Sequence, residues 1–242
     1  MNASITATRF WKTRRPLLED QLAFGALSGI GLILASVIGA IGTDRISRVE
    51  LSAWELAASL IVWYVAVMSG YLAWRMIPLW VTSGRSRRSA TNEMLIVVGS
   101  IILLSTVIVL FGYAIENIVY RIADWPQEIG NDHHFDSHTD FGPILVEYLV
   151  QYLLWGAIGF FIGLAFYRFE SLGWLSLLPG ALILGVVGST DGLGPMGFLA
   201  DLIPSVDPNA LWVYTILTIP FVPIALAASW YIARDMPIRR KS

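Results

Sequence analysis

Residues 76 to 95 read MIPLWVTSGRSRRSATNEML and join two long apolar runs, at about 56 to 77 and 94 to 119. Each run has close to the ~20 residues that a helix needs to cross the hydrocarbon core of a bilayer. The connection between them is short and carries three arginines, and arginine collects in loops that stay on the cytoplasmic side. This stretch therefore predicts a cytoplasmic elbow between two membrane-spanning helices.

Four further apolar runs extend the pattern, at about 22 to 43, 144 to 166, 172 to 190 and 211 to 233. The chain has 242 residues, of which 56% are hydrophobic and 14% are charged, whereas about a quarter of an ordinary soluble domain is charged. No connection is long enough to form a soluble domain of its own. We predict a single all-α transmembrane domain over residues 1–242, a polytopic bundle of six transmembrane helices.

Basic residues fall almost wholly on alternate connections of this six-helix pattern. Thirteen of the sixteen lie on one side, namely Arg9, Lys12, Arg14, Arg15, Arg75, Arg85, Arg87, Arg88, Arg168, Arg234, Arg239, Arg240 and Lys241. Only Arg45, Arg48 and Arg121 lie on the other. The positive-inside rule then places both termini in the cytoplasm, with the acidic loops outside. We expect a multi-pass protein of the cell membrane.

The N-terminal part begins with a basic segment, residues 1–20, that we expect to lie at the cytoplasmic interface. The apolar run that follows is longer than the ~7 to 15 residues of a signal-peptide core. We therefore expect an uncleaved first transmembrane helix rather than a secretory signal peptide.

The arginines of the elbow, Arg85, Arg87 and Arg88, have two interpretations. They satisfy the topology rule and do nothing more, or they form a docking surface. Guanidinium groups are rigid multidentate donors that suit the carboxylates and carbonyls of a partner protein, and Ser83 or Ser89 is suited to cap a short helix there.

The chain resembles the permease subunits of bacterial ATP-binding-cassette exporters of the ABC-2 type. The resemblance rests on the six spans, the basic N-terminus, the elbow pattern Pro78-x5-Gly84-x2-Arg87-Arg88, a glycine-rich fourth span ending in AFYRFESLGW at 165 to 174, a partly apolar last outer loop and a basic tail. These features cover most of the chain. The elbow is the only compact motif among them.

The resemblance implies a division of labour between this chain and its partners. In that family the connection after the second span is a coupling helix that seats in a groove of the ATPase subunit. The residues that take this role by resemblance are Thr82, Ser83, Gly84, Arg85, Ser86, Arg87, Arg88 and Ser89, with a secondary inner contact at Arg168 and Glu170. The implied partners are two copies of the ATPase and a second permease, either this chain or a related one. ATP and magnesium would bind the ATPase, because this chain has no phosphate-binding loop motif.

Ionisable residues at membrane depth are candidates for a substrate pathway, because hydrocarbon opposes their charge. Glu116, with Asn117 beside it, lies inside its predicted helix and ranks first, and Glu147 is a further candidate. The alternative is that these carboxylates are helix-end residues that pair with the arginines of the outer side. Because such charges are few, we expect an amphipathic or hydrophobic substrate and an external energy source rather than an ion-driven carrier.

All three histidines lie in the outer loop NDHHFDSHTD, residues 131 to 140. Neutral imidazoles and carboxylates together bind zinc, nickel or copper, so His133, His134, His138 and Asp136 are candidate metal ligands. The alternative, which we prefer, is a solvated acidic loop that holds no metal.

Glycine and proline residues predict how two of the spans pack. Gly156, Gly159 and Gly163 lie on one side of the fourth span and allow close helix approach, either within one subunit or at a dimer seam. Pro220 and Pro223 remove backbone donors and predict a kink in the last span.

We therefore expect a permease subunit, not itself an enzyme and without a cofactor of its own, that forms the pathway for export of an amphipathic substrate. Membrane lipid, but no nucleic acid, is expected among its partners. Two other classes stay open: a non-transporting membrane accessory or sensor protein with an acidic outer loop, and a secondary carrier or channel.

Overall fold

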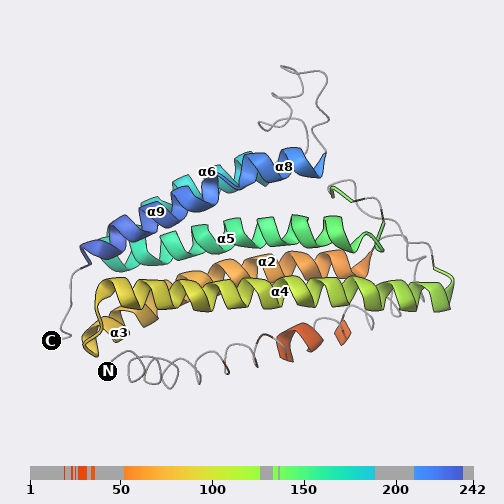
Figure 1. Ribbon diagram of the computed structural model, residues 1–242, viewed down its shortest axis with the longest axis horizontal. Coiled ribbons are helices and arrows are strands. Elements are labelled where there is room, and N and C mark those ends of the chain that lie inside the picture. The colour runs from red at the N-terminus through yellow and green to blue at the C-terminus, as the bar shows by residue number, and fades with distance from the viewer. Residues whose placement is uncertain are drawn as a thin grey trace, which may run out of the picture.

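The protein is described by a computed structural model in which every regular element of the described residues is a helix. The described residues are 52–125, 133–135, 137–188 and 210–236, with Glu19 and short pieces of 23–35. The helices lie side by side in an elongated bundle (Figure 1). Four stretches are long and apolar enough to cross a membrane: Ala57–Thr82, Arg87–Ala123, Phe141–Ile183 and Leu211–Arg234. The predicted all-helical fold is thus confirmed for the described residues, and these four stretches are compatible with the predicted membrane protein.

The second predicted span is a continuous rod of three elements, α2 (Ala53–Tyr71), the π-helical turn η1 (Leu72–Met76) and α3 (Ile77–Thr82). The π-helical turn comes directly before Pro78. Proline has no N–H to donate to the carbonyl four residues earlier, and its ring crowds that carbonyl. The widened turn accommodates this clash without breaking the rod.

Helix α4 (Arg87–Ala123) has 37 residues and at 1.5 Å per residue is about 55 Å long. The predicted span, 94 to 119, lies within this helix. The Ser86 hydroxyl accepts a hydrogen bond from the Ser89 N–H and caps its start. Asp124 ends the helix in the left-handed conformation, at φ 55°. Because the hydrocarbon core is only ~30 Å thick, α4 extends beyond it.

Helix α5 (Phe141–Phe169) is the centre of the bundle and contacts α2, α4, α6, α8 and α9. A 3₁₀ turn, η2 (Glu170–Ser176), leads into α6 (Leu177–Gly188), which packs back against α5. The fifth span was predicted at 172 to 190, but its α-helix begins only at Leu177. Its 12 residues extend about 18 Å.

Glycines bring α5 against α2 at backbone distance. A Cβ added at Gly159 would lie 2.1 Å from the Ala66 carbonyl oxygen, and one at Gly163 would lie 2.1 Å from the Gly70 carbonyl oxygen. Gly156 faces Ile102 of α4. The glycines of the fourth predicted span therefore pack within one subunit, which decides between the two arrangements left open by the sequence.

The last predicted span is broken, as its prolines predicted. It consists of α8 (Leu211–Thr218) and α9 (Phe221–Arg234), and Pro220 stands between them as the residue before α9. The α-helix is therefore interrupted at the position where the sequence predicted a kink.

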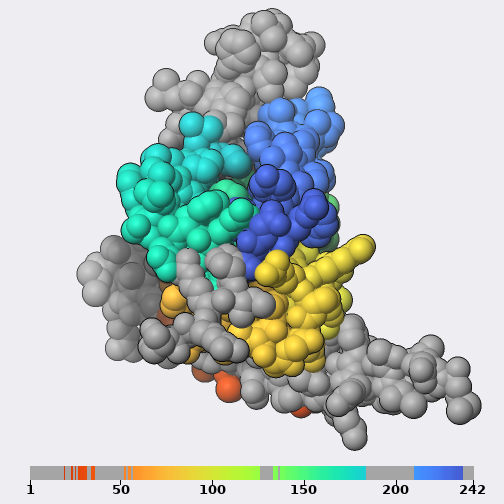
Figure 2. All heavy atoms as spheres, turned by 90° about the vertical axis from the view of Figure 1, so that its left-hand side faces the viewer, coloured from red at the N-terminus to blue at the C-terminus, as the bar shows by residue number. Residues whose placement is uncertain are grey.

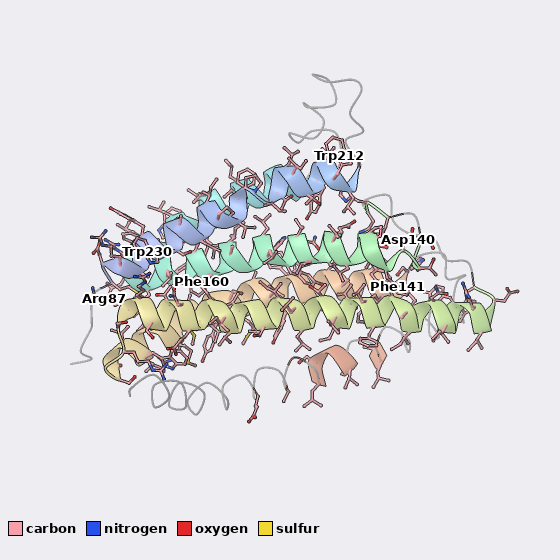
Figure 3. The ribbon with its side chains drawn as sticks, in the orientation of Figure 1. Arg87, Asp140, Phe141, Phe160, Trp212 and Trp230 are labelled. Carbon is pink, nitrogen blue, oxygen red and sulfur yellow. The ribbon has the colours of Figure 1, made fainter. Side chains whose placement is uncertain are left out.

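The bundle has two chemically different ends. At one end, Arg87 at the start of α4 lies close to the end of α9, which carries Trp230; at the other lie Asp140 and Phe141 (Figure 3). We call the first the basic end, because Arg85, Arg87, Arg88, Arg168 and Arg234 gather there. We call the second the histidine end, because residues 133–138 cover it.

Candidate functional site

The elbow at the basic end is a tight turn whose hydrogen bonds are local. The hydroxyls of Thr82 and Ser83 donate to carbonyls of the last turn of α3, at 2.9 and 2.8 Å. Gly84 has φ +92°, a conformation that glycine adopts without the steric cost borne by other residues. Ser86 then caps α4. The sequence thus folds into a short hairpin with a defined shape.

Two of the predicted docking residues are engaged inside the chain. The Arg85 guanidinium forms an ion pair with Glu93 and lies 4.5 Å from the centre of the Trp80 ring. The Ser89 hydroxyl also donates to Glu93, at 2.9 Å. Since Glu93 is buried, its charge requires such partners. Arg85 therefore holds the start of α4 against the end of α3, and Ser89 supports Glu93 from within α4.

Two further arginines tie the elbow and α5 to the end of α9. Arg87 Nη1 donates to the Arg234 carbonyl oxygen at 3.0 Å, and Arg168 Nη1 donates to the Ile232 carbonyl oxygen at 3.2 Å. The last carbonyls of a helix have no partner within the helix, and cations are favourable beside them. Figure 2 shows this end of the molecule, with the last turns of α9 beside the start of α4 and α3.

Arg88 and Glu170 are the remaining charged residues of the predicted docking surface, and both are exposed. Within the described ranges Arg88 makes no hydrogen bond or ion pair. Glu170 has φ 48°, and its N–H caps α5 by donating to the Phe166 carbonyl. Of the elbow arginines, Arg88 thus has its guanidinium available to a partner.

At the histidine end, the loop folds back over carboxylates of α2 and α5. His133 bridges two of them: Nδ1 lies 2.8 Å from Oε1 of Glu147, and Nε2 lies 3.1 Å from Oε1 of Glu55. The His134 N–H donates to Oε2 of Glu147 at 2.8 Å. The side chains of His133, His134 and His138 are 14%, 5% and 4% exposed. The expectation of a solvated loop is wrong for these residues, because the carboxylates draw them into the bundle.

Glu116 is buried and caps α2. It accepts a hydrogen bond from the Ser52 hydroxyl at 2.7 Å and one from the Trp54 N–H at 3.0 Å, where the positive end of the helix dipole favours a carboxylate. Oε2 of Glu116 lies 3.9 Å from Nε2 of His138. Asn117 is buried beside it. Because Arg45 and Arg48 lie outside the described residues, a pairing with the outer arginines stays a prediction.

Aromatic side chains surround these polar groups. The hydroxyls of Tyr113 and Tyr148 share a hydrogen bond of 2.8 Å. Phe135 packs edge-on against Tyr113 with ring centres 5.7 Å apart, and the His134 ring lies 4.7 Å from that of Tyr214. The loop is therefore held by α4, α5 and α8 together. We call Glu55, Glu116, Glu147, the three histidines, Tyr113 and Tyr148 the histidine-end cluster.

The two histidines with shifted pKa values differ in charge at neutral pH. Burial disfavours the cation of His133, but hydrogen bonds to Glu147 and Glu55 outweigh this effect and raise its pKa to about 9. Burial lowers the pKa of His138, against an opposing effect of Glu55. At pH 7 the cluster therefore holds an imidazolium at His133 between two carboxylates and a neutral ring at His138.

Metal binding receives no support from this geometry. Within the described ranges, no three His, Asp or Glu side chains form a group that could hold a metal ion. His133 directs both ring nitrogens at carboxylates, and a metal ligand must be a neutral imidazole. Asp136 lies outside the described residues, so the preferred metal-free interpretation stays a prediction.

Three of the cluster residues were not singled out by the sequence analysis as functional: Glu55, Tyr113 and Tyr148. The sequence contains a pattern that indicates Tyr113: Tyr113 and Glu116 are three residues apart on α4 and so lie on one helix face. Glu147 and Tyr148 are adjacent at the same end of α5. Polar groups at the same depth in several apolar helices indicate a shared buried site.

Comparisons with protein-family models, with curated proteins and with solved structures give no match for this chain. The resemblance to ABC-2 permeases therefore rests on the sequence features alone.

Proposed function

We propose that this chain is the permease subunit of an ATP-binding-cassette transporter of the ABC-2 type. It pairs with a second permease, is driven by two copies of a separate ATPase that binds ATP and magnesium, and exports an amphipathic or hydrophobic substrate across the cell membrane. In this proposal the chain has six spans and its basic end faces the cytoplasm. The observation that carries it is the elbow, a rigid hairpin that exposes Arg88 while joining three helices.

The contacts of the elbow supply a route for force. Pressure on the elbow acts on α4 through its capped start and on α9 through the hydrogen bond from Arg87 to the Arg234 carbonyl. Helix α4 is a single rod of 37 residues, and at its far part Glu116 holds the start of α2. Movement of α4 by the ATPase would therefore disturb the histidine-end cluster, which we assign to the outer closure of the pathway, with Glu116, Asn117 and Glu147 beside it.

The proposal is tested by purifying the tagged chain from its native membranes and identifying co-purified proteins by mass spectrometry. An ATP-binding-cassette ATPase is expected in the complex of the unchanged chain. Arg88→Glu should abolish its recovery, because the reversed charge faces the docking groove. Arg121→Glu, at the other end of α4, is the matched control and should retain it. Full assembly and ATP-dependent transport by the Arg88→Glu variant would refute the docking role.

A second function is favoured by the cluster itself. A partly buried imidazolium held by two carboxylates suits a non-transporting sensor of external alkalinity, in which loss of the His133 proton as pH rises through about 9 releases the outer loop. A chain that remains free of any ATPase in the co-purification, yet changes its loop conformation with pH, would favour this sensor.

A further inference from the structure

An apolar groove of about 660 Å³ opens between α2 and α6, with α5 as its floor. Its lining is almost wholly apolar and consists of Trp63, Ala66, Val67, Gly70, Tyr71, Trp74, Trp155, Ile158, Gly159, Ile162, Gly163, Phe166, Leu177, Gly180 and Ala181. The close packing of α5 on α2 at Gly159 and Gly163 leaves no side chain there to fill it. The groove therefore suits a hydrocarbon and not a polar ligand.

The groove lies in the half of the bundle next to the basic end. Along the α2 rod its lining runs from Trp63 to Trp74, which at 1.5 Å per residue is about 16 Å. This length is half of the ~30 Å hydrocarbon core, the depth of one leaflet. Trp63 and Trp155 meet edge to face with ring centres 4.9 Å apart and mark the end of the groove nearest the middle of the bundle.

A cation adjoins the other end of the groove in the chain. Trp74 is the last lining residue of the α2 rod, and Arg75 follows it within the π-helical turn η1. Arg75 is exposed, and within the described ranges it makes no hydrogen bond or ion pair. Trp74 beside it is also exposed, and tryptophan favours headgroup depth. A guanidinium at this depth matches a phosphate geometrically.

We propose that this groove binds one phospholipid from the leaflet at the basic end, with an acyl chain between α2 and α6 and its phosphate at Arg75. Neighbouring lipid tails are as apolar as the groove, so the lining alone cannot select a ligand. Selection comes from the charge-assisted hydrogen bond between Arg75 and the phosphate. The site does not depend on the proposed coupling to an ATPase.

The other apolar occupant that could cover the groove is a transmembrane helix of a second copy, and the oligomeric state of the protein distinguishes it from an acyl chain.

Native mass spectrometry of the full chain in detergent, with dioleoyl phosphatidylglycerol added, tests the proposal. The unchanged chain should retain one phospholipid. Ala181→Trp places an indole in the groove and should displace it. Its control, Ala227→Trp, makes the same change at an exposed position of α9 outside the groove and should retain it.

The charge is tested separately. Arg75→Gln should weaken retention by about tenfold, the size expected for a hydrogen bond to a charged group. Arg234→Gln, which removes an exposed cation at the same end on α9, should bind normally. Circular dichroism checks that each variant is folded, and Ala181→Leu replaces the tryptophan variant if that one is not.

Two results would overturn the proposal. Equal phospholipid retention by the Arg75→Gln variant and by the unchanged chain would show that the headgroup phosphate does not bind Arg75. A dimer that becomes monomeric with Ala181→Trp, with no phospholipid on the unchanged chain, would show that a second copy covers the groove.

Discussion

Nδ1 of His133 lies 2.8 Å from Oε1 of Glu147. This pair fastens the loop at the histidine end to α5, which contacts α2, α4, α6, α8 and α9. The same imidazole reaches Glu55 of α2 through its other nitrogen. One protonated side chain thus links α5 and α2 at the histidine end. Loss of its charge should therefore weaken the attachment of the loop to these two helices.

Removal of one carboxylate from this link should destabilise the protein in proportion to the carboxylate's burial. Glu147→Gln leaves a buried imidazolium with one charged partner fewer, and we expect a loss of about 3 kcal/mol in the free energy of unfolding. Glu55→Gln should cost less, because the Glu55 side chain is 25% exposed against 8% for Glu147. Unfolding in detergent, followed by circular dichroism, measures both. A larger loss for Glu55→Gln would contradict the assignment of Glu147 as the main partner.

Stability should depend on pH through the two histidines. The pKa of His133 is about 9 in the folded protein against ~6.5 unfolded, which corresponds to roughly 3 kcal/mol of stabilisation. That stabilisation is fully present below pH 6.5 and is lost as pH rises through 9. The pKa of His138 is lowered, so its contribution is present above pH 6.5 and is lost as pH falls.

The melting temperature should therefore be highest near pH 6.5 and decrease on both sides, on the alkaline side up to about pH 9. Measurement from pH 5 to 10 tests this profile. His133→Gln should remove the decrease above about pH 6.5 and leave the acid side in place. An unchanged alkaline profile in that variant would mean that His133 is not the titrating group.

The glycine contacts between α5 and α2 predict opposite effects at two glycines. Gly163→Ala places a methyl group against the Gly70 carbonyl oxygen, and since backbone cannot yield, we expect a cost of about 1–3 kcal/mol. Gly99→Ala, in α4, meets no atom within 4 Å and should stabilise by up to about 1 kcal/mol through helix propensity. Thermal unfolding of both variants measures the difference, and equal effects would count against the close packing.

Arg87 and Arg88 are neighbours, yet we expect different effects from replacing them. Arg87→Gln removes the hydrogen bond to the Arg234 carbonyl and should lower stability by about 1 kcal/mol. Arg88→Gln should leave stability unchanged, because its side chain is exposed. The two melting temperatures separate them. If Arg88→Gln lowered the melting temperature and Arg87→Gln did not, Arg88 rather than Arg87 would be the arginine that stabilises the fold.

Local sequence patterns were sufficient for the helical class, for the broken last span and for the clustering of arginines at one end of the bundle. These features depend on the hydropathy and backbone limits of contiguous residues, as at Pro220. Local patterns do not give the full length of helix α4, because a hydropathy pattern records which residues prefer hydrocarbon, whereas the helix continues from Arg87 to Ala123.

The tertiary structure alone decided which residues meet. His133 contacts Glu147, 14 residues away, and Glu55, 78 residues away, and the sequence analysis placed its loop in solvent. The groove beneath Arg75 likewise depends on glycines that bring α5 against α2. Which faces of two helices oppose each other is set by rotation about their axes and by the close fit of small residues. Composition determines that the helices enter a membrane, and packing between them determines what they enclose.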